Sequence, residues 1–235
     1  MKSTPHRAAV AALALMAAAA ACSHAPPQTS PSPSAQQAAV DTGELAAIAQ
    51  ARADSIRHPY TQADIDFMSH MIGHHAQAIQ MASWAPSHGA SPAVQTLASR
   101  IINAQRDEIA TMQRWLRDRQ QPVPDPDAML QQMQGHHMDM PGMNMSGLMP
   151  GMLTPRQMAQ LDSARGPEFD RLFLTGMIQH HRGALTMVKE LFGSYGAGQD
   201  ELVFKFASDV NVDQTTEIAR MQKMLVDVLF QGRAQ

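Results

Sequence analysis

The sequence contains one cysteine, Cys22, so it cannot form an intramolecular disulfide or a zinc or redox site built on several thiols. Aromatic residues make up only 5% of the chain, whereas sheet-rich domains rely on aromatic and β-branched side chains. A formal net charge of −3 provides no basic excess for binding nucleic acid. These absences favour a helical protein and restrict metal ligands to His, Met and carboxylates.

The N-terminal residues have the composition of an export signal. Lys2 and Arg7 precede an Ala/Leu-rich run over 8–21, which is too short to cross a bilayer as a helix. The small residues before Cys22 are typical of a lipoprotein cleavage site, at which the cysteine becomes lipidated; ordinary cleavage nearby is the alternative. We expect a signal peptide at 1–22 and an exported lipoprotein of the periplasm or cell envelope that contacts the membrane only through its lipid.

The rest of the chain divides by composition and periodicity. Residues 23–40 are rich in Pro, Ser, Gln and Ala, so 23–60 is expected to be a disordered tether that can include one short helix. Apolar residues at helical spacing, bounded by capping signals and by Pro or Gly, then predict two helical hairpins. The expected helices span about 61–85, 91–119, 166–193 and 200–230, and a shorter helix opens at Thr154-Pro155.

The two hairpins, within 61–120 and 154–235, repeat each other. In the first helices, seven matching positions from Phe67 to Met81 recur 106 residues later. In the second helices, the matching positions begin at Ala98 and recur 109 residues later. Two similar hairpins predict an all-α fold, in which one four-helix bundle over 61–235 has approximate two-fold symmetry.

Each first helix carries an adjacent His-His pair flanked by methionines at helical spacing. Because neighbours on a helix are about 100° apart, one ring of each pair should point inward while the other lies on the shoulder of the helix. A single inward histidine is more often an ordinary core residue, but two aligned pairs with aligned methionines favour a shared metal site. The predicted ligands are His74, His75, His180 and His181, supported by the sulfurs of Met71, Met81, Met177 and Met187.

Imidazole and thioether groups together favour Cu(I), and imidazole also accepts Cu(II). Glu108 and Glu217 occupy matching positions in the second helices, where they can orient the histidine rings or simply lie on the surface. Asp64 and Asp170 are expected to be first-turn acids that interact with the helix dipole rather than ligands.

Residues 121–153 form a Pro-, Gly- and Met-rich insertion without a sustained helical period, and we expect it to be long and mobile. Exposed methionine is apolar and easily oxidised, so its concentration here indicates a function. An adhesive segment is the alternative. The predicted ligands of this segment, suited to Cu(I) or Ag(I), are His136, His137, Met138, Met140, Met143 and Met145.

The paired motifs resemble a known family. A phenylalanine, Met-Ile and His-His occur at 67–75 and again at 173–181, and Gln-x-x-Glu-Ile is also repeated. Over roughly residues 60–230 the chain is similar to the bacterial domain of unknown function 305. The resemblance implies a ferritin-like bundle, and some members resemble periplasmic copper-binding proteins of copper resistance.

The patterns together predict an extracytoplasmic copper-binding protein that sequesters or delivers Cu(I) or Cu(II) in copper tolerance or homeostasis and is not an enzyme. Its expected partners are the metal ion and a copper efflux or delivery protein. One alternative is an envelope adaptor without metal, whose Met-rich surface binds a partner protein. Another is a ferritin-like metal oxidase, although di-iron bundles use Glu-x-x-His pairs and this sequence has none.

Overall fold

The computed structural model describes residues 42–51, 53, 59–135 and 148–231. These residues form helices and no strands, so the predicted all-α class is confirmed. None of the helices in these ranges is both long and apolar enough to cross a membrane. The predicted signal peptide and the lipidation site Cys22 lie outside the described residues.

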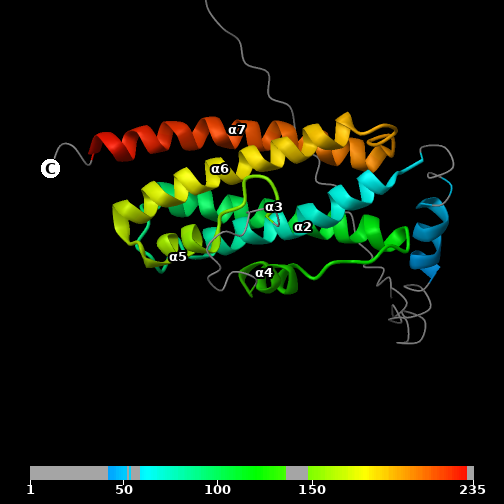
Figure 1. The fold of residues 1–235 in the computed structure, drawn as a ribbon, viewed down its shortest axis with the longest axis horizontal. Coiled ribbons are helices and arrows are strands. Elements are labelled where there is room, and N and C mark those ends of the chain that lie inside the picture. The colour runs from blue at the N-terminus through cyan, green and yellow to red at the C-terminus, as the bar shows by residue number, and fades with distance from the viewer. Residues whose placement is uncertain (1–41, 52, 54–58, 136–147, 232–235) are drawn as a thin grey trace, which may run out of the picture. The chain divides into compact units, whose positions relative to one another are not determined.

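Four long helices form two hairpins (Figure 1). α2 (Gln62–Ser83) packs along α3 (Pro92–Asp118), and α6 (Gly166–Gly193) packs along α7 (Glu201–Gln231). α2 also packs against α6, which joins the hairpins, and the short α5 (Pro155–Ser163) contacts both of these helices. These elements correspond to the helices predicted from periodicity and capping signals.

Local side-chain bonds fix where the helices begin. At the start of α2, Asp64 N–H donates to Thr61 Oγ1, and Asp64 Oδ2 accepts from Thr61 N–H, which completes a capping box. At the start of α3, Ser91 accepts a hydrogen bond from Val94 N–H, and Pro92 occupies the first helical position. Such caps satisfy backbone donors that a helix end leaves free.

Two buried aspartates also tie the hairpins to each other. Asp64 Oδ1 accepts a hydrogen bond of 2.7 Å from the N–H of Gly198, just before α7. Asp170, its equivalent in the repeat, accepts one of 3.1 Å from the N–H of Ser91, just before α3. Asp64 lies in the first turn as predicted, whereas Asp170 lies one turn further into its helix. Both carboxylates therefore act across hairpins, which the dipole interpretation missed.

The prediction that residues 121–153 lack helical structure is wrong at one end. α4 (Pro126–Gly135) forms there and packs against α2. Its start is stabilised by Asp125, whose Oδ1 accepts from the N–H groups of Asp127 and Ala128. An Asp-Pro start is a local helix signal that the high Met and Gln content obscured. The predicted ligands of this segment lie outside the described residues: His136, His137, Met138, Met140, Met143 and Met145.

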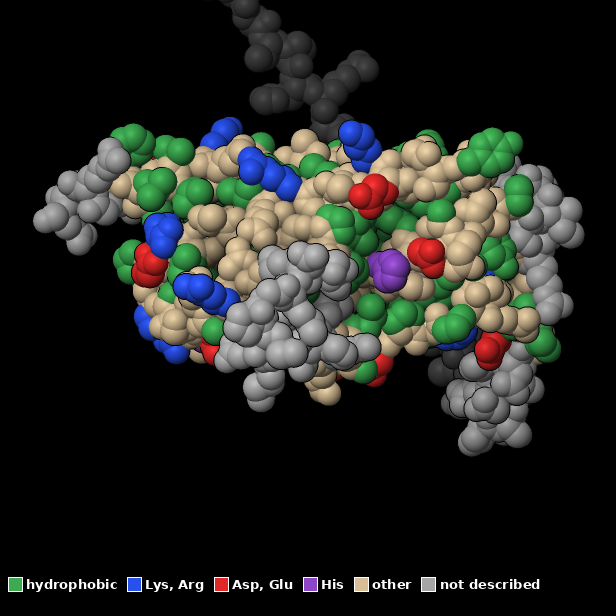
Figure 2. Space-filling model, in the orientation of Figure 1, with side chains coloured by type: hydrophobic (Ala, Val, Ile, Leu, Met, Phe, Trp, Pro, Cys, Tyr) green, Lys and Arg blue, Asp and Glu red, His purple; other side chains and the backbone are tan. Residues whose placement is uncertain are grey.

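The surface is mixed in character on the face drawn in Figure 2. Lys and Arg as well as Asp and Glu side chains are scattered over it, with hydrophobic side chains among them. The exposed apolar residues include Phe192, Tyr195 and Phe204 near the turn between α6 and α7.

Candidate metal centre

The four predicted histidines lie at the same level of the bundle core. Along α2, the buried hydrophobic residues up to Ile72 belong to one cluster and those from Ala78 onward to another. Along α6, the same boundary falls between Ile178 and Ala184. The His-His pairs occupy both boundaries, and all four side chains have 0% exposed surface. We refer to His74, His75, His180 and His181 as the histidine layer.

The inward rings are His74 and His180. Their centroids lie 3.8 Å apart, with planes inclined at 39°. The ring of His75 lies 6.4 Å from that of His74, and the ring of His181 lies 6.3 Å from that of His180. These outer rings are fully buried rather than on a helix shoulder, since each is covered by the second helix of its own hairpin.

The outer rings contact the two glutamates that the repeat singled out. His181 Nε2 donates to Glu217 Oε2 at 2.6 Å. His75 Nε2 lies at the same distance, 2.6 Å, from Glu108 Oε2, but its ring N–H is not aligned for a hydrogen bond. A carboxylate beside one ring nitrogen favours the proton on that nitrogen and leaves the other nitrogen basic.

The inner rings contact backbone carbonyls instead. His74 Nε2 donates to the Pro150 carbonyl at 3.0 Å, and His180 Nε2 donates to the His74 carbonyl at 2.9 Å. Because a carbonyl oxygen only accepts, both Nε2 atoms carry the proton, and each Nδ1 of the neutral ring then carries a lone pair.

Burial keeps the inner rings neutral. Desolvation, followed by the positive charge that His75 can carry, lowers the pKa of His74 to about 3. Desolvation and the neighbouring His74 lower the pKa of His180 well below its ordinary 6.5. Neither ring is therefore protonated at neutral pH, and both lone pairs are available.

The Nδ1 atoms of all four rings are buried without a hydrogen-bond partner in the structure. An unpaired buried polar atom costs about 1–3 kcal/mol, so four at one level are unusual. The amides of Gln105 and Gln214, equivalent in the repeat, add further unpaired buried atoms one turn before each glutamate. Sequence reasoning gave these glutamines no role, although their repetition was a signal.

The predicted methionines flank the histidine layer on both sides. Met71 of α2 and Met187 of α6 belong to one hydrophobic cluster, while Met81 and Met177 belong to the other. All four are buried. Each side of the layer thus receives one thioether from each hairpin.

The layer is not preassembled around an ion. Within the described ranges, no group of three or more His, Cys, Asp or Glu residues surrounds a common metal position. The contact between His74 and His180 contributes to this, since the two rings pack against each other in a tilted arrangement with centroids 3.8 Å apart and leave no space for an ion between them. The donor types, imidazole and thioether, fit copper, but coordination requires the rings to rotate.

Residues 148–153, here named the strap, cross over α2 and α6 beside the inner rings. The Pro150 carbonyl of the strap is the acceptor for His74. Leu153 N–H donates to Gln77 Oε1 at 2.7 Å, and Gln77 Nε2 donates back to the Leu153 carbonyl at 3.0 Å. The end of the Met-rich insertion is therefore bonded to the helix that carries His74.

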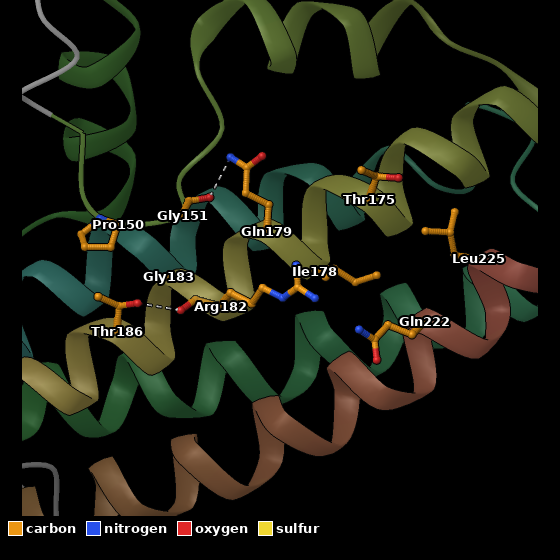
Figure 3. Close-up of a pocket in the computed structure, with 10 residues that line it drawn as sticks. All are labelled: Pro150, Gly151, Thr175, Ile178, Gln179, Arg182, Gly183, Thr186, Gln222 and Leu225. Carbon is orange, nitrogen blue, oxygen red and sulfur yellow. Dashed lines mark hydrogen bonds between the residues drawn. The ribbon is translucent and has the colours of Figure 1, made fainter.

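Two glycines allow the strap to approach so closely. A Cβ added to Gly183 would lie 1.9 Å from the Pro150 carbonyl oxygen, and Gly151 has a φ of +75°. Outside the strap, a pocket of about 590 Å³ opens between the strap, α6 and α7 (Figure 3). In this view Gln179 reaches the strap, where its Nε2 donates to the Gly151 carbonyl at 3.3 Å.

A second pocket, of about 330 Å³, lies between α3 and α7 and is named the acidic pocket. Four of its lining residues are acids, and Lys205 is the one basic residue among those lining it: the acids are Asp107, Glu108, Asp209 and Asp213. Partial burial and the negative charges of Glu108, Asp209 and Glu217 raise the pKa of Asp213. The two glutamates that contact the outer rings, Glu108 and Glu217, therefore both raise the pKa of this aspartate.

The chain belongs to the family described as domain of unknown function DUF305, whose model matches residues 64–225, more than half of the sequence. The resemblance inferred from the paired motifs is thus confirmed. A DUF305 protein from Streptomyces coelicolor is 25% identical with a TM-score of 0.57, over 71% of this chain and 93% of that one. A DUF305 fragment from Deinococcus radiodurans is 26% identical with a TM-score of 0.56, over 72% of this chain and 99% of the fragment.

The fold is also similar to that of CopM, solved in a Cu(II)-bound form. The two chains are 26% identical with a TM-score of 0.52, over 70% of this chain and 96% of CopM. A Cu(I)-bound form of CopM gives a TM-score of 0.50. No curated protein matches the chain.

Proposed function

We propose that the protein binds copper in its histidine layer and acts outside the cytoplasm as a copper-sequestering or copper-delivering protein rather than as an enzyme. The observation that carries this proposal is the set of four buried Nδ1 atoms without hydrogen-bond partners. Unpaired buried acceptors destabilise a fold unless something else satisfies them. A metal ion bound by Nδ1 would do so.

The charge state of the layer supports copper as cargo. Since the inner rings stay neutral, no proton has to leave before an imidazole nitrogen binds the ion. The thioethers on both sides add soft donors, which favour Cu(I), while imidazole nitrogens also accept Cu(II). Rotation of His74 and His180 out of their tilted contact would bring nitrogens from both hairpins to one ion.

The comparisons support the same proposal. CopM, with a similar fold, has been solved with Cu(II) and with Cu(I) bound. Export and lipid anchoring through Cys22, capture of Cu(I) or Ag(I) by the Met- and His-rich residues 136–145, and transfer to an efflux or delivery protein remain parts of the proposal that rest on sequence.

A Cu(I) competition titration of the full chain tests the proposal. Wild type should bind Cu(I), and the variant His74→Gln/His180→Gln should lose at least about tenfold in affinity, because it removes both inner nitrogens. His88→Gln is a matched control, since His88 is also buried but has hydrogen-bond partners at both ring nitrogens. Cu(I) binding by the double variant equal to that of the control would contradict the proposal.

A deletion variant tests the insertion separately. Removing residues 136–147 retains the residues of the strap and of α4 and should lower the number of bound Cu(I) ions without abolishing binding. An unchanged number of ions would remove the insertion from the copper-binding function and leave the histidine layer as the binding site.

A further inference from the structure

We propose that the acidic pocket between α3 and α7 is the port through which a hydrated metal cation reaches the histidine layer, with Glu108, which lines the pocket, passing it from solvent to the outer ring of His75. This inference rests on the proposed copper binding and adds the route and the residues that form it. The candidate residues of the port, beyond Glu108, are Asp209 and Asp213.

The glutamates connect solvent to the buried rings. The Glu108 side chain is 21% exposed and lines the acidic pocket, yet its Oε2 lies 2.6 Å from Nε2 of the fully buried His75. The Glu217 side chain is 26% exposed and makes the equivalent contact with His181. Each carboxylate therefore touches solvent at one end and a ring without solvent access at the other.

Two buried side chains next to residues of this route have polar atoms without a hydrogen bond. His75 Nε2 faces the carboxylate of Glu108 without an aligned hydrogen bond, and its ring is fully buried. Gln214, the neighbour of Asp213, is 3% exposed and has no partner for either amide atom. Polar groups left unpaired inside a protein need an explanation, and a cation passing with part of its hydration shell would supply their partners.

The charge of the pocket favours cations. Lys205 is the single basic residue that lines it, and its Nζ is bonded to Asp209, so it offsets only one of the acids. Clustered acids raise the local cation concentration and the rate of association. Carboxylate oxygens can replace water ligands of a divalent ion before the softer imidazole nitrogens take over.

On the strap side, the residues that the structure describes cover the inner rings. There the strap lies against α6 with its Pro150 carbonyl on His74, and backbone packs on backbone at Gly151 and Gly183. The pocket outside the strap is separated from the inner rings by the strap itself. The acidic pocket is therefore the side on which polar side chains lead to the layer.

Stopped-flow association with Cu(II), followed by quenching of tryptophan fluorescence at low ionic strength, tests the port on the full-length protein. Asp209→Asn/Asp213→Asn should lower the association rate constant by at least about threefold and leave the number of bound ions unchanged. Asp66→Asn/Asp227→Asn is the matched control, because it removes the same charge at exposed positions that do not line the pocket. Its rate constant should stay within about twofold of wild type.

The outcomes separate the port from the proposed function. If wild type binds Cu(II) and the port variant associates at the wild-type rate, the port is wrong and copper binding stands. An equal slowing in the control variant would attribute the effect to net charge and also overturn the port. Loss of one bound ion in the port variant would show that the aspartates are metal ligands rather than part of the route, and would overturn the port. Absence of Cu(II) and Cu(I) binding by wild type would overturn the proposed function itself.

Discussion

The two hairpins of the bundle agree at their outer histidines and differ at their inner ones. His75 and His181 each contact a glutamate of the following helix at 2.6 Å. The inner histidines differ from each other. His74 donates to the Pro150 carbonyl of the strap, and His180 donates to the carbonyl of His74. The duplicated sequence therefore builds a symmetric pair of outer contacts around an inner pair that is asymmetric.

The difference begins at positions where the repeat breaks. Gln77 is equivalent to Gly183, and the glutamine bonds Leu153 of the strap while the glycine makes room for its Pro150. One hairpin thus supplies the polar anchor and the other supplies the space. A repeated ligand motif can thus acquire a single cover through residue changes outside the motif.

The largest expected effect is on the pH dependence of the free energy of unfolding, which should distinguish the inner rings from ordinary histidines. The unfolded chain protonates His74 and His180 near pH 6.5, whereas their folded pKa values are lower, so the unfolded state binds more protons between the folded pKa and pH 6.5. The free energy of unfolding should therefore rise with pH in this window and level off above it. The slope is at most about 1.4 kcal/mol per pH unit for each histidine.

Denaturant unfolding of the metal-free protein between pH 5 and 7.5 measures this slope. His74→Gln/His180→Gln should have a flatter profile than wild type. The control His88→Gln should have a steeper profile than this double variant. A profile unchanged by the double substitution would mean that folding does not lower the pKa values of the inner rings.

A smaller effect is expected where the strap meets α6. Gly183→Ala should lower the free energy of unfolding by about 1–3 kcal/mol, because its Cβ would collide with the Pro150 carbonyl and displace the strap. Gly193→Ala is the matched control on the same helix, since nothing lies within 4 Å of its added Cβ. The control should be neutral or slightly stabilising, as alanine favours a helix. Equal stability of the two variants would show that the strap does not rest on α6.

The smallest expected effect concerns the stability that the two outer histidine–glutamate contacts contribute. Glu217→Gln should lower the free energy of unfolding by about 1–2 kcal/mol, and Glu108→Gln by less, because only His181 donates an aligned hydrogen bond to its glutamate. Both substitutions should weaken Cu(I) binding by about tenfold or more, since each carboxylate orients its ring. Urea unfolding and competition titration measure the two quantities. A larger stability loss for Glu108→Gln would reverse this ranking of the contacts.

Much of the architecture was predictable because local sequence patterns determine where the helices begin and end. Periodicity and caps located α2, α3, α6 and α7, and the repeat directed attention to the histidine pairs and to Glu108 and Glu217. The contact between Pro150 and His74 was not predictable, because a backbone carbonyl has no residue signature and the partners lie 76 residues apart. The acidic pocket was not predictable either, since Asp209 and Asp213 belong to no motif and come close to Glu108 only through tertiary packing.

The most direct test concerns the ring nitrogens of the histidine layer. Long-range ¹H–¹⁵N correlation spectra of ¹⁵N-histidine-labelled protein distinguish Nδ1 from Nε2 and can be recorded before and after addition of Cu(I), which is diamagnetic. We predict that His74 and His180 carry their protons on Nε2 in the metal-free protein and that their Nδ1 resonances shift when Cu(I) binds. Saturation with Cu(I) that leaves these Nδ1 resonances in place would contradict the account.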